Sequence, residues 1–222
     1  AQENVVDFIV SPPPNPDLLH QAAYVCVHLN DLENAAQALE KALQIYPDFN
    51  PLMVMDLAII YALQGQHKQA LDALDIEQSL ISQYPQIAIL TADLFSNIGE
   101  YEHACAALIS IDDSALKTLE TDTTPPLLIS KSPLLYSHDL TLDGYHLRLG
   151  YLFRALGHFE ESLEHLTLTH QRNKGDIKLT NAIIETAMVG LDHKPVLEIT
   201  QHITPSELLK NKDSHDLLDL IC

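Results

Sequence analysis

Histidine is the residue type whose number in this sequence could signal metal chemistry, since the chain holds twelve. His158, His165 and His170 lie close together in the sequence, and histidine is a common zinc ligand. Their spacings of seven and five residues do not bring three ligands to one face of a helix, and no His-Glu-x-x-His motif occurs. The pattern predicts no metal site and favours histidines solvated on helix surfaces.

The motifs of nucleophilic and phosphate chemistry are also missing from the sequence. No Gly-x-Ser-x-Gly, Walker, Gly-x-Gly-x-x-Gly or Cys–His arrangement occurs, and the 7 glycines fall mostly where turns are expected. The sequence therefore predicts a protein that is not an enzyme, with no catalytic residues and no cofactor. A hydrolase that uses the histidines is the alternative, and it would need a bound metal.

The 3 cysteines, Cys26, Cys105 and Cys222, have no short spacing, so they predict neither a zinc knuckle nor a disulfide framework. This usage favours a reducing compartment, and we expect a cytoplasmic protein. The first residues, Ala1 and Gln2, leave open a removed signal peptide or a fragment boundary. No apolar run approaches the roughly 18 residues needed to span a membrane, so we expect no direct membrane insertion.

The formal charge is 12 − 31 = −19, which disfavours nucleic acid and anionic membranes as partners. The N-terminal half carries most of this charge. Residues 1–116 hold two cations, Lys41 and Lys68, against 16 acids, and 2 − 16 = −14. A basic partner protein would be attracted to this half, although solubility alone is the simpler explanation.

Small, aromatic and apolar residues recur at helical spacing, most clearly between Leu147 and Leu166. Gly150 is small enough for a second helix to approach closely, and Phe153 lies one turn further along the same face. Gly157 stands where the first helix must stop, because a residue past a helix end often needs a positive φ. The segment predicts two antiparallel helices joined by a short turn.

The expected turn residues recur at a nearly constant interval. Asn30, Gly65 and Gly99 are 35 and 34 residues apart, Gly157 follows 58 residues later, and Gly190 follows 33 after that. Such an interval is typical of stacked repeats. We therefore predict helix–turn–helix repeats over 17–111 and 143–203, with Asp17 as the first N-cap.

Three further segments flank or interrupt these repeats. We predict a proline-rich arm at 1–16, an insertion at 112–142 and a capping helix at 204–222. Pro125, Pro126 and Pro133 interrupt the insertion, yet it also contains apolar residues. It is either an ordered excursion folded against the repeats or a mobile loop.

The earlier repeats match the Leu147–Leu166 pattern in part, at Ala23, Ala35, Ala42, Pro47, Tyr61, Gly65, Ala70, Phe95, Gly99, Tyr101 and Ala104. Together with Leu149, Gly150, Phe153, Gly157 and Phe159, these residues resemble the tetratricopeptide repeat family. The sequence departs from the family pattern in having no tryptophan. The resemblance implies an all-α fold, a right-handed α-solenoid of about five repeats with an insertion after the third.

In this family the first helix of each repeat lines a concave groove. The resemblance thus implies partner-binding residues at Tyr24, His28, Leu52, Met55, Ile59, Leu63, Ile89, Asp93, Asn97, Leu147, Tyr151, Arg154, Ile184 and Met188. Most are apolar, and the paired Lys and Asn that grip a C-terminal carboxylate in some members are missing. The implied ligand is a peptide or amphipathic helix of another protein.

The resemblance implies a scaffold or adaptor that binds a partner protein during assembly of a larger complex. A small acidic secretion-type chaperone that keeps a partner soluble is the alternative. A third possibility is that the insertion or a terminal segment of this same chain fills the groove.

Overall fold

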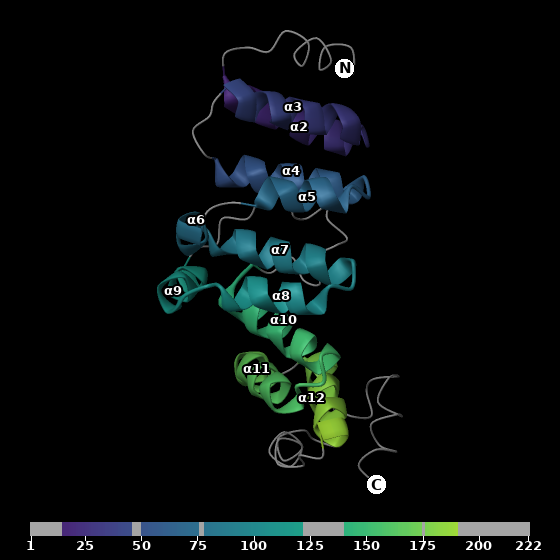
Figure 1. The fold of residues 1–222 in the computed structure, drawn as a ribbon, viewed down its shortest axis with the longest axis vertical. Helices are drawn as coiled ribbons and strands as arrows, with labels where there is room; N and C mark the ends of the chain where they lie inside the picture. The colour runs from purple at the N-terminus through teal and green to yellow at the C-terminus, as the bar shows by residue number, and fades with distance from the viewer. Residues whose placement is uncertain (1–14, 46–49, 76–77, 122–139, 175, 191–222) are drawn as a thin grey trace. The chain divides into compact units, whose positions relative to one another are not determined.

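The computed structural model describes residues 15–45, 50–75, 78–121, 140–174 and 176–190, and every regular element in these ranges is an α-helix (Figure 1). The chain divides into two compact units, Ala1–Tyr145 and His146–Cys222. The boundary falls inside α10 (Leu142–Ala155). Most of the predicted N-terminal arm, the second helix of the fifth repeat and the predicted capping helix lie outside the described residues.

The first unit is a stack of helix pairs (Figure 1). The pairs are α2 (Pro16–His28) with α3 (Leu32–Ile45), α4 (Pro51–Leu63) with α5 (His67–Leu74), and α7 (Pro85–Asn97) with α8 (Tyr101–Ile109). Helices within a pair pack on each other, and contacts of α3 with α4 and of α5 with α7 join successive pairs. This arrangement is the one that the repeat interval predicts.

Asparagine caps two of the first helices of these pairs. Asn15 Oδ1 accepts the backbone N–H of Asp17 at 2.9 Å, and Pro16 takes the first helical position, where a missing N–H costs nothing. Asn50 repeats the arrangement ahead of Pro51, accepting from two backbone N–H groups. The prediction of Asp17 as the first N-cap is therefore wrong, because Pro16, the last residue of the predicted arm, begins the helix.

The predicted turns share one backbone geometry. Asn30, Gly65, Gly99 and Gly157 have φ between 59° and 84°, in the left-handed region that suits glycine or asparagine. The residue after each of them donates its backbone N–H to the carbonyl of the residue five positions before that donor, over 2.8–2.9 Å. This bonding is the Schellman arrangement that satisfies the last carbonyls of a helix. The predicted turn positions are confirmed at these four residues.

The second unit contains α10 from His146 onward, α11 (Phe159–Arg172) and α12 (Ile177–Gly190). At Gly150 an added Cβ would lie 2.6 Å from two side-chain carbons of Leu166, and Ser162 Oγ donates to the Gly150 carbonyl at 2.7 Å. The close helix approach predicted at Gly150 is therefore confirmed. One buried core cluster of the unit consists of Leu163, Leu166, Leu179, Ala182, Ile183 and Ala187.

Gly190 differs from the other predicted turn glycines. It is the last residue of α12, and it is not among the described residues with a positive φ. Its small size serves packing instead, since an added Cβ would lie 2.8 Å from the Cβ of Phe159.

Two short helices depart from the simple repeat. The sequence predicts that the second helix of the second repeat extends nearly to Tyr84, but α5 ends at Leu74, and α6 (Gln78–Gln83) is separate. Residues 112–142, predicted as an insertion, begin with α9 (Asp113–Thr121), which packs on α6 and α7. Residues 122–139 lie outside the described part of the chain.

Candidate partner-binding surface

The predicted groove residues of the first unit differ widely in exposure. Those at the centres of α4 and α7 are at most 3% exposed, whereas those near the helix ends are accessible. From exposed to buried they are Tyr24, His28 and Asn97, then Leu52 and Leu63, then Met55, Ile59, Ile89 and Asp93. A partner reaches the last four only after the side chains packed on them move.

The composition of α4 explains part of this burial. Its residues read PLMVMDLAIIYAL, so it has no polar face, and a helix that is apolar on every side is stable only when surrounded. The resemblance to a family predicts the direction in which Met55 and Ile59 point. It does not predict what packs over them.

The one charged residue of α4 is buried with a partner. Asp56 is 0% exposed, and its Oδ2 lies 2.6 Å from Nε2 of His20, which is 8% exposed on α2. A buried carboxylate requires such a partner because it has lost its hydration. This contact joins the first helices of the first two repeats.

The predicted groove residues of the second unit are also only partly accessible. The Arg154 guanidinium donates to Glu185 Oε2 at 2.7 Å, which links α10 to α12. The five residues are Met188, which is exposed, Leu147, Tyr151 and Arg154, which are half-buried, and Ile184, which is buried. Leu147 and Tyr151 pack against the core of the unit.

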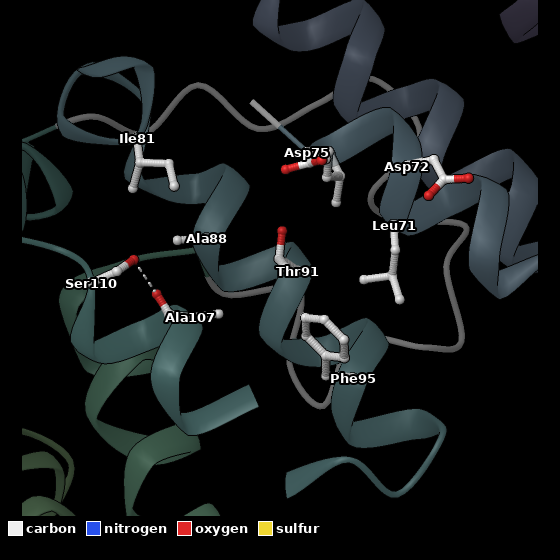
Figure 2. A pocket seen from close by; sticks show the side chains of 10 residues that line it. Leu71, Asp72, Asp75, Ile81, Ala88, Thr91, Phe95, Ala107 and Ser110 are labelled. Carbon is white, nitrogen blue, oxygen red and sulfur yellow. Dashed lines mark hydrogen bonds between the residues drawn. The ribbon is translucent and has the colours of Figure 1, made fainter. Parts of the chain in front are cut away.

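An open hollow of about 310 Å³ lies between α5 and α8, over α7, in the first unit (Figure 2). We call it the apolar hollow, and it is lined by Leu71, Asp72, Leu74, Asp75, Ile81, Ala88, Thr91, Phe95, Ala107 and Ser110. In Figure 2 the Asp75 carboxylate points toward the hollow, whereas that of Asp72 points away from it. Leu71, Thr91 and Phe95 approach one another from α5 and α7.

The apolar hollow exists because α5 is short. α5 has 8 residues where α3 has 14, and its chain leaves the helix at Asp75, with φ −74° and ψ 87°. The surface of α7 next to Thr91 is therefore left open on this side. The sequence alone does not predict this hollow, because a single aspartate is only a weak signal for the end of a helix.

A second hollow of about 470 Å³ lies between α3 and α5 and is mostly polar. We call it the polar hollow, and its lining residues are Glu33, Ala36, Gln37, Glu40, Tyr61, Gln64, Gln66 and Gln69. Tyr61 Oη donates to Glu40 Oε1 at 2.6 Å. Burial, reinforced by this bond to a carboxylate, raises the pKa of Tyr61 to about 12.

Carboxylates supply the charge of both hollows. Glu33 and Glu40 line the polar hollow, Asp72 and Asp75 line the apolar one, and no lysine or arginine of the described residues lines either. The local potential is therefore negative and favours a cationic partner.

A sequence model described as tetratricopeptide repeat matches residues 27–76, from the last two residues of α2 to the residue after Asp75. The helix pairs and their left-handed turns extend the same repeat beyond this match. The chain contains a tetratricopeptide repeat at residues 27–76 and has the fold of a tetratricopeptide repeat solenoid. A comparison with curated proteins found no match in sequence.

Solved structures with a similar fold include other repeat proteins. MamA protein is 16% identical, with a TM-score of 0.60 over 84% of this chain and 88% of that one. MamA 41-end from Desulfovibrio magneticus RS-1 is 14% identical, with a TM-score of 0.59 over 84% and 91%. YrrB, described as a TPR protein with an unusual peptide-binding site, is 14% identical, with a TM-score of 0.57 over 90% of each chain. At these identities the likeness establishes the α-solenoid fold.

Some of the described histidines pack against neighbouring rings. His146 and His165 lie on α10 and α11 with their Nδ1 atoms 2.9 Å apart, and Phe153 stacks on His165 with ring centroids 5.6 Å apart. Burial lowers the pKa of His165 and of His170. The expectation of solvated histidines is thus wrong for these two, which are half-buried, and right for His158, which is exposed.

Three further features of the described residues concern metal binding, cysteine reactivity and membrane-spanning helices. They contain no group of three or more His, Cys, Asp or Glu residues placed to hold a metal ion. Cys26 and Cys105 are buried, and burial raises the pKa of both thiols, which makes them poor nucleophiles. None of the described helices is long and apolar enough to cross a membrane.

Proposed function

We propose that this protein is a non-catalytic scaffold that holds a peptide or helix of a partner protein during assembly of a larger complex. The observation that supports this function best is the apolar hollow, an open depression with carbon walls and carboxylates at its edge, set in a stack of repeats. Pockets that bind ligands are concave and mostly apolar, with a few polar groups that orient the ligand.

The predicted groove contributes to this proposal through its accessible residues. Tyr24 and His28 lie one turn apart on α2 with ring centroids 4.4 Å apart, and both are exposed. Aromatic residues of this kind are enriched in protein interfaces. The partner is a basic segment in our proposal because the first unit carries most of the negative charge and few cations.

Site-specific photocrosslinking tests the proposed function. A photoreactive amino acid is placed at Asp75 beside the apolar hollow, at Tyr24 on the groove side, or at exposed Gln171 as a control. We expect one protein to be captured in the expressing cell from position 75 or 24 and not from 171. Capture of no protein from 75 and 24, or the same proteins from all three positions, would contradict the scaffold function.

The captured protein also distinguishes a scaffold from a secretion-type chaperone. A chaperone's partner is insoluble when expressed alone and becomes soluble on co-expression with this chain. A scaffold's partner is already folded and soluble by itself.

A further inference from the structure

We propose that the apolar hollow receives one apolar side chain from a basic partner segment, with a lysine or arginine of that segment beside the Asp75 carboxylate. This inference rests on the proposed function and specifies the chemistry of the partner at that site.

The polar groups inside the apolar hollow are already bonded. Thr91 Oγ1 donates to the carbonyl of Ile87 at 2.9 Å, and Ser110 Oγ donates to the carbonyl of Ala107 at 2.7 Å (Figure 2). Their hydroxyl protons are therefore not free for a ligand. A polar ligand group would lose its hydration here without gaining a hydrogen bond from these hydroxyl groups. An apolar group, in contrast, is stabilised by leaving water.

The hollow is large enough to admit a large apolar side chain. Its volume of about 310 Å³ is near the lower end of the range of ligand pockets, roughly 300–1,000 Å³. Ala88 and Ala107 line it and leave this room, while Leu71 and Phe95 supply carbon contacts. A leucine, isoleucine, methionine or phenylalanine can enter, whereas a whole helix must stay outside.

The charge around the hollow selects a basic neighbour for that side chain. Asp75 is exposed beside the opening, and the sequence has no lysine or arginine from residue 69 to residue 116. Asp112 follows Ser110 by two residues and is also exposed. Hydrogen bonds from Ser114, Ala115 and Ser82 lower the pKa of Asp112 to about 2, so it stays ionised at neutral pH.

One wall of the hollow is braced from outside. Ser82 Oγ donates to Asp112 Oδ2 at 2.9 Å, which ties α6, the helix that carries Ile81, to the start of α9. A hollow with a braced wall loses less conformational entropy when a ligand binds.

The polar hollow also borders α5. Gln69 lines the polar hollow and Asp72 lines the apolar hollow, and these two residues are one turn apart on α5. A partner segment that crosses α5 would therefore meet apolar walls on one side and Glu33 and Glu40 on the other. We expect its basic residues to lie on both sides of the apolar anchor.

A library of short displayed random peptides is the probe for this inference. The library is selected against the full-length chain, and enriched peptides are measured by fluorescence anisotropy against three variants. Ala107→Leu narrows the hollow, Asp75→Lys reverses the charge beside it, and Glu160→Lys makes the same charge change at an exposed site in the second unit. Circular dichroism and urea unfolding verify that each variant is folded.

We expect enriched peptides to combine a large apolar residue with nearby lysine or arginine. Their affinity should fall about tenfold or more with Ala107→Leu and with Asp75→Lys, the range of an interface hot spot, and stay within about twofold with Glu160→Lys. The loss with Asp75→Lys should shrink at high salt, and the loss with Ala107→Leu should not.

The inference is overturned if no peptide is enriched, if enriched peptides lack this composition, or if folded Ala107→Leu and Asp75→Lys bind them as the wild type does. The photocrosslinking experiment separates this outcome from failure of the scaffold function. Capture of the same partner from position 24 in the Ala107→Leu chain would leave the scaffold function standing and remove the anchor site.

Discussion

Two pairs of helices in this protein differ in how much space lies between them. Between α10 and α11, Gly150 lies so close to Leu166 that an added methyl group would overlap it. Between α5 and α8, the early end of α5 leaves a hollow of about 310 Å³ over α7. The same kind of repeat thus builds a closed contact in one place and an open one in another. Sites where a partner can bind therefore depend on local helix length as well as on the repeat pattern.

The buried contact between His20 of α2 and Asp56 of α4 gives the largest expected change in the free energy of unfolding. Asp56→Ala removes a fully buried carboxylate that bonds His20, and it should lower the free energy of unfolding by roughly 3 kcal/mol, as measured for broken buried pairs. Urea unfolding measures the change. Asp72→Ala, at an exposed position of α5, is the matched control and should stay within about 0.5 kcal/mol of the wild type.

Gly150→Leu tests the closed contact between α10 and α11. The new side chain must push Leu166 and the backbone of α11 away, and overpacking of this kind costs about 1–3 kcal/mol. Chemical denaturation followed by circular dichroism gives the value. A loss below about 0.5 kcal/mol would show that α11 moves away at little cost, so that the contact is not closed in solution.

Acid should weaken the same contact through His165. Burial lowers the pKa of this half-buried imidazole below its ordinary 6.5, so the unfolded chain binds the proton more readily than the folded one. The stability that His165 contributes is then present above pH 6.5 and is lost as the pH falls through the lowered pKa. NMR titration of the imidazole reports its pKa directly.

The matching variant is His165→Asn, which removes the titrating ring. Its loss of stability from pH 7 to pH 5 should be smaller than that of the wild type, measured by urea unfolding at both pH values. An equal loss in both chains would assign the acid sensitivity to other groups.

Ala107→Leu at the open contact should have the smallest effect on stability. The hollow offers space for the added carbons, so the free energy of unfolding should stay within about 0.5 kcal/mol of the wild type. Comparison with Gly150→Leu is direct because both changes introduce a leucine into a helix of a repeat. A cost as large as that of Gly150→Leu would mean that the hollow is closed in solution.

The two kinds of contact were unequally predictable from sequence. Gly150 is visible as a small residue at helical spacing from Phe153, and the turn at Gly157 follows from the backbone freedom of glycine. The groove was predicted less completely. The family resemblance indicates which way side chains such as Met55 and Ile89 face, but it does not predict that they are buried. Asp17 was misassigned because the neighbouring Asn15 caps the helix, and Gly190, where α12 ends, also packs against Phe159.

Helical spacing, left-handed turns, the repeat interval and the excess of acids follow from the amino-acid sequence alone, because each depends on a few neighbouring residues or on composition. These follow from backbone sterics and charge. Tertiary structure alone decided that α5 stops at Leu74, that Asp56 is buried against His20, and that a hollow opens beside Thr91. The physical reason is that burial and empty space belong to the packing of several helices, so no single segment encodes them.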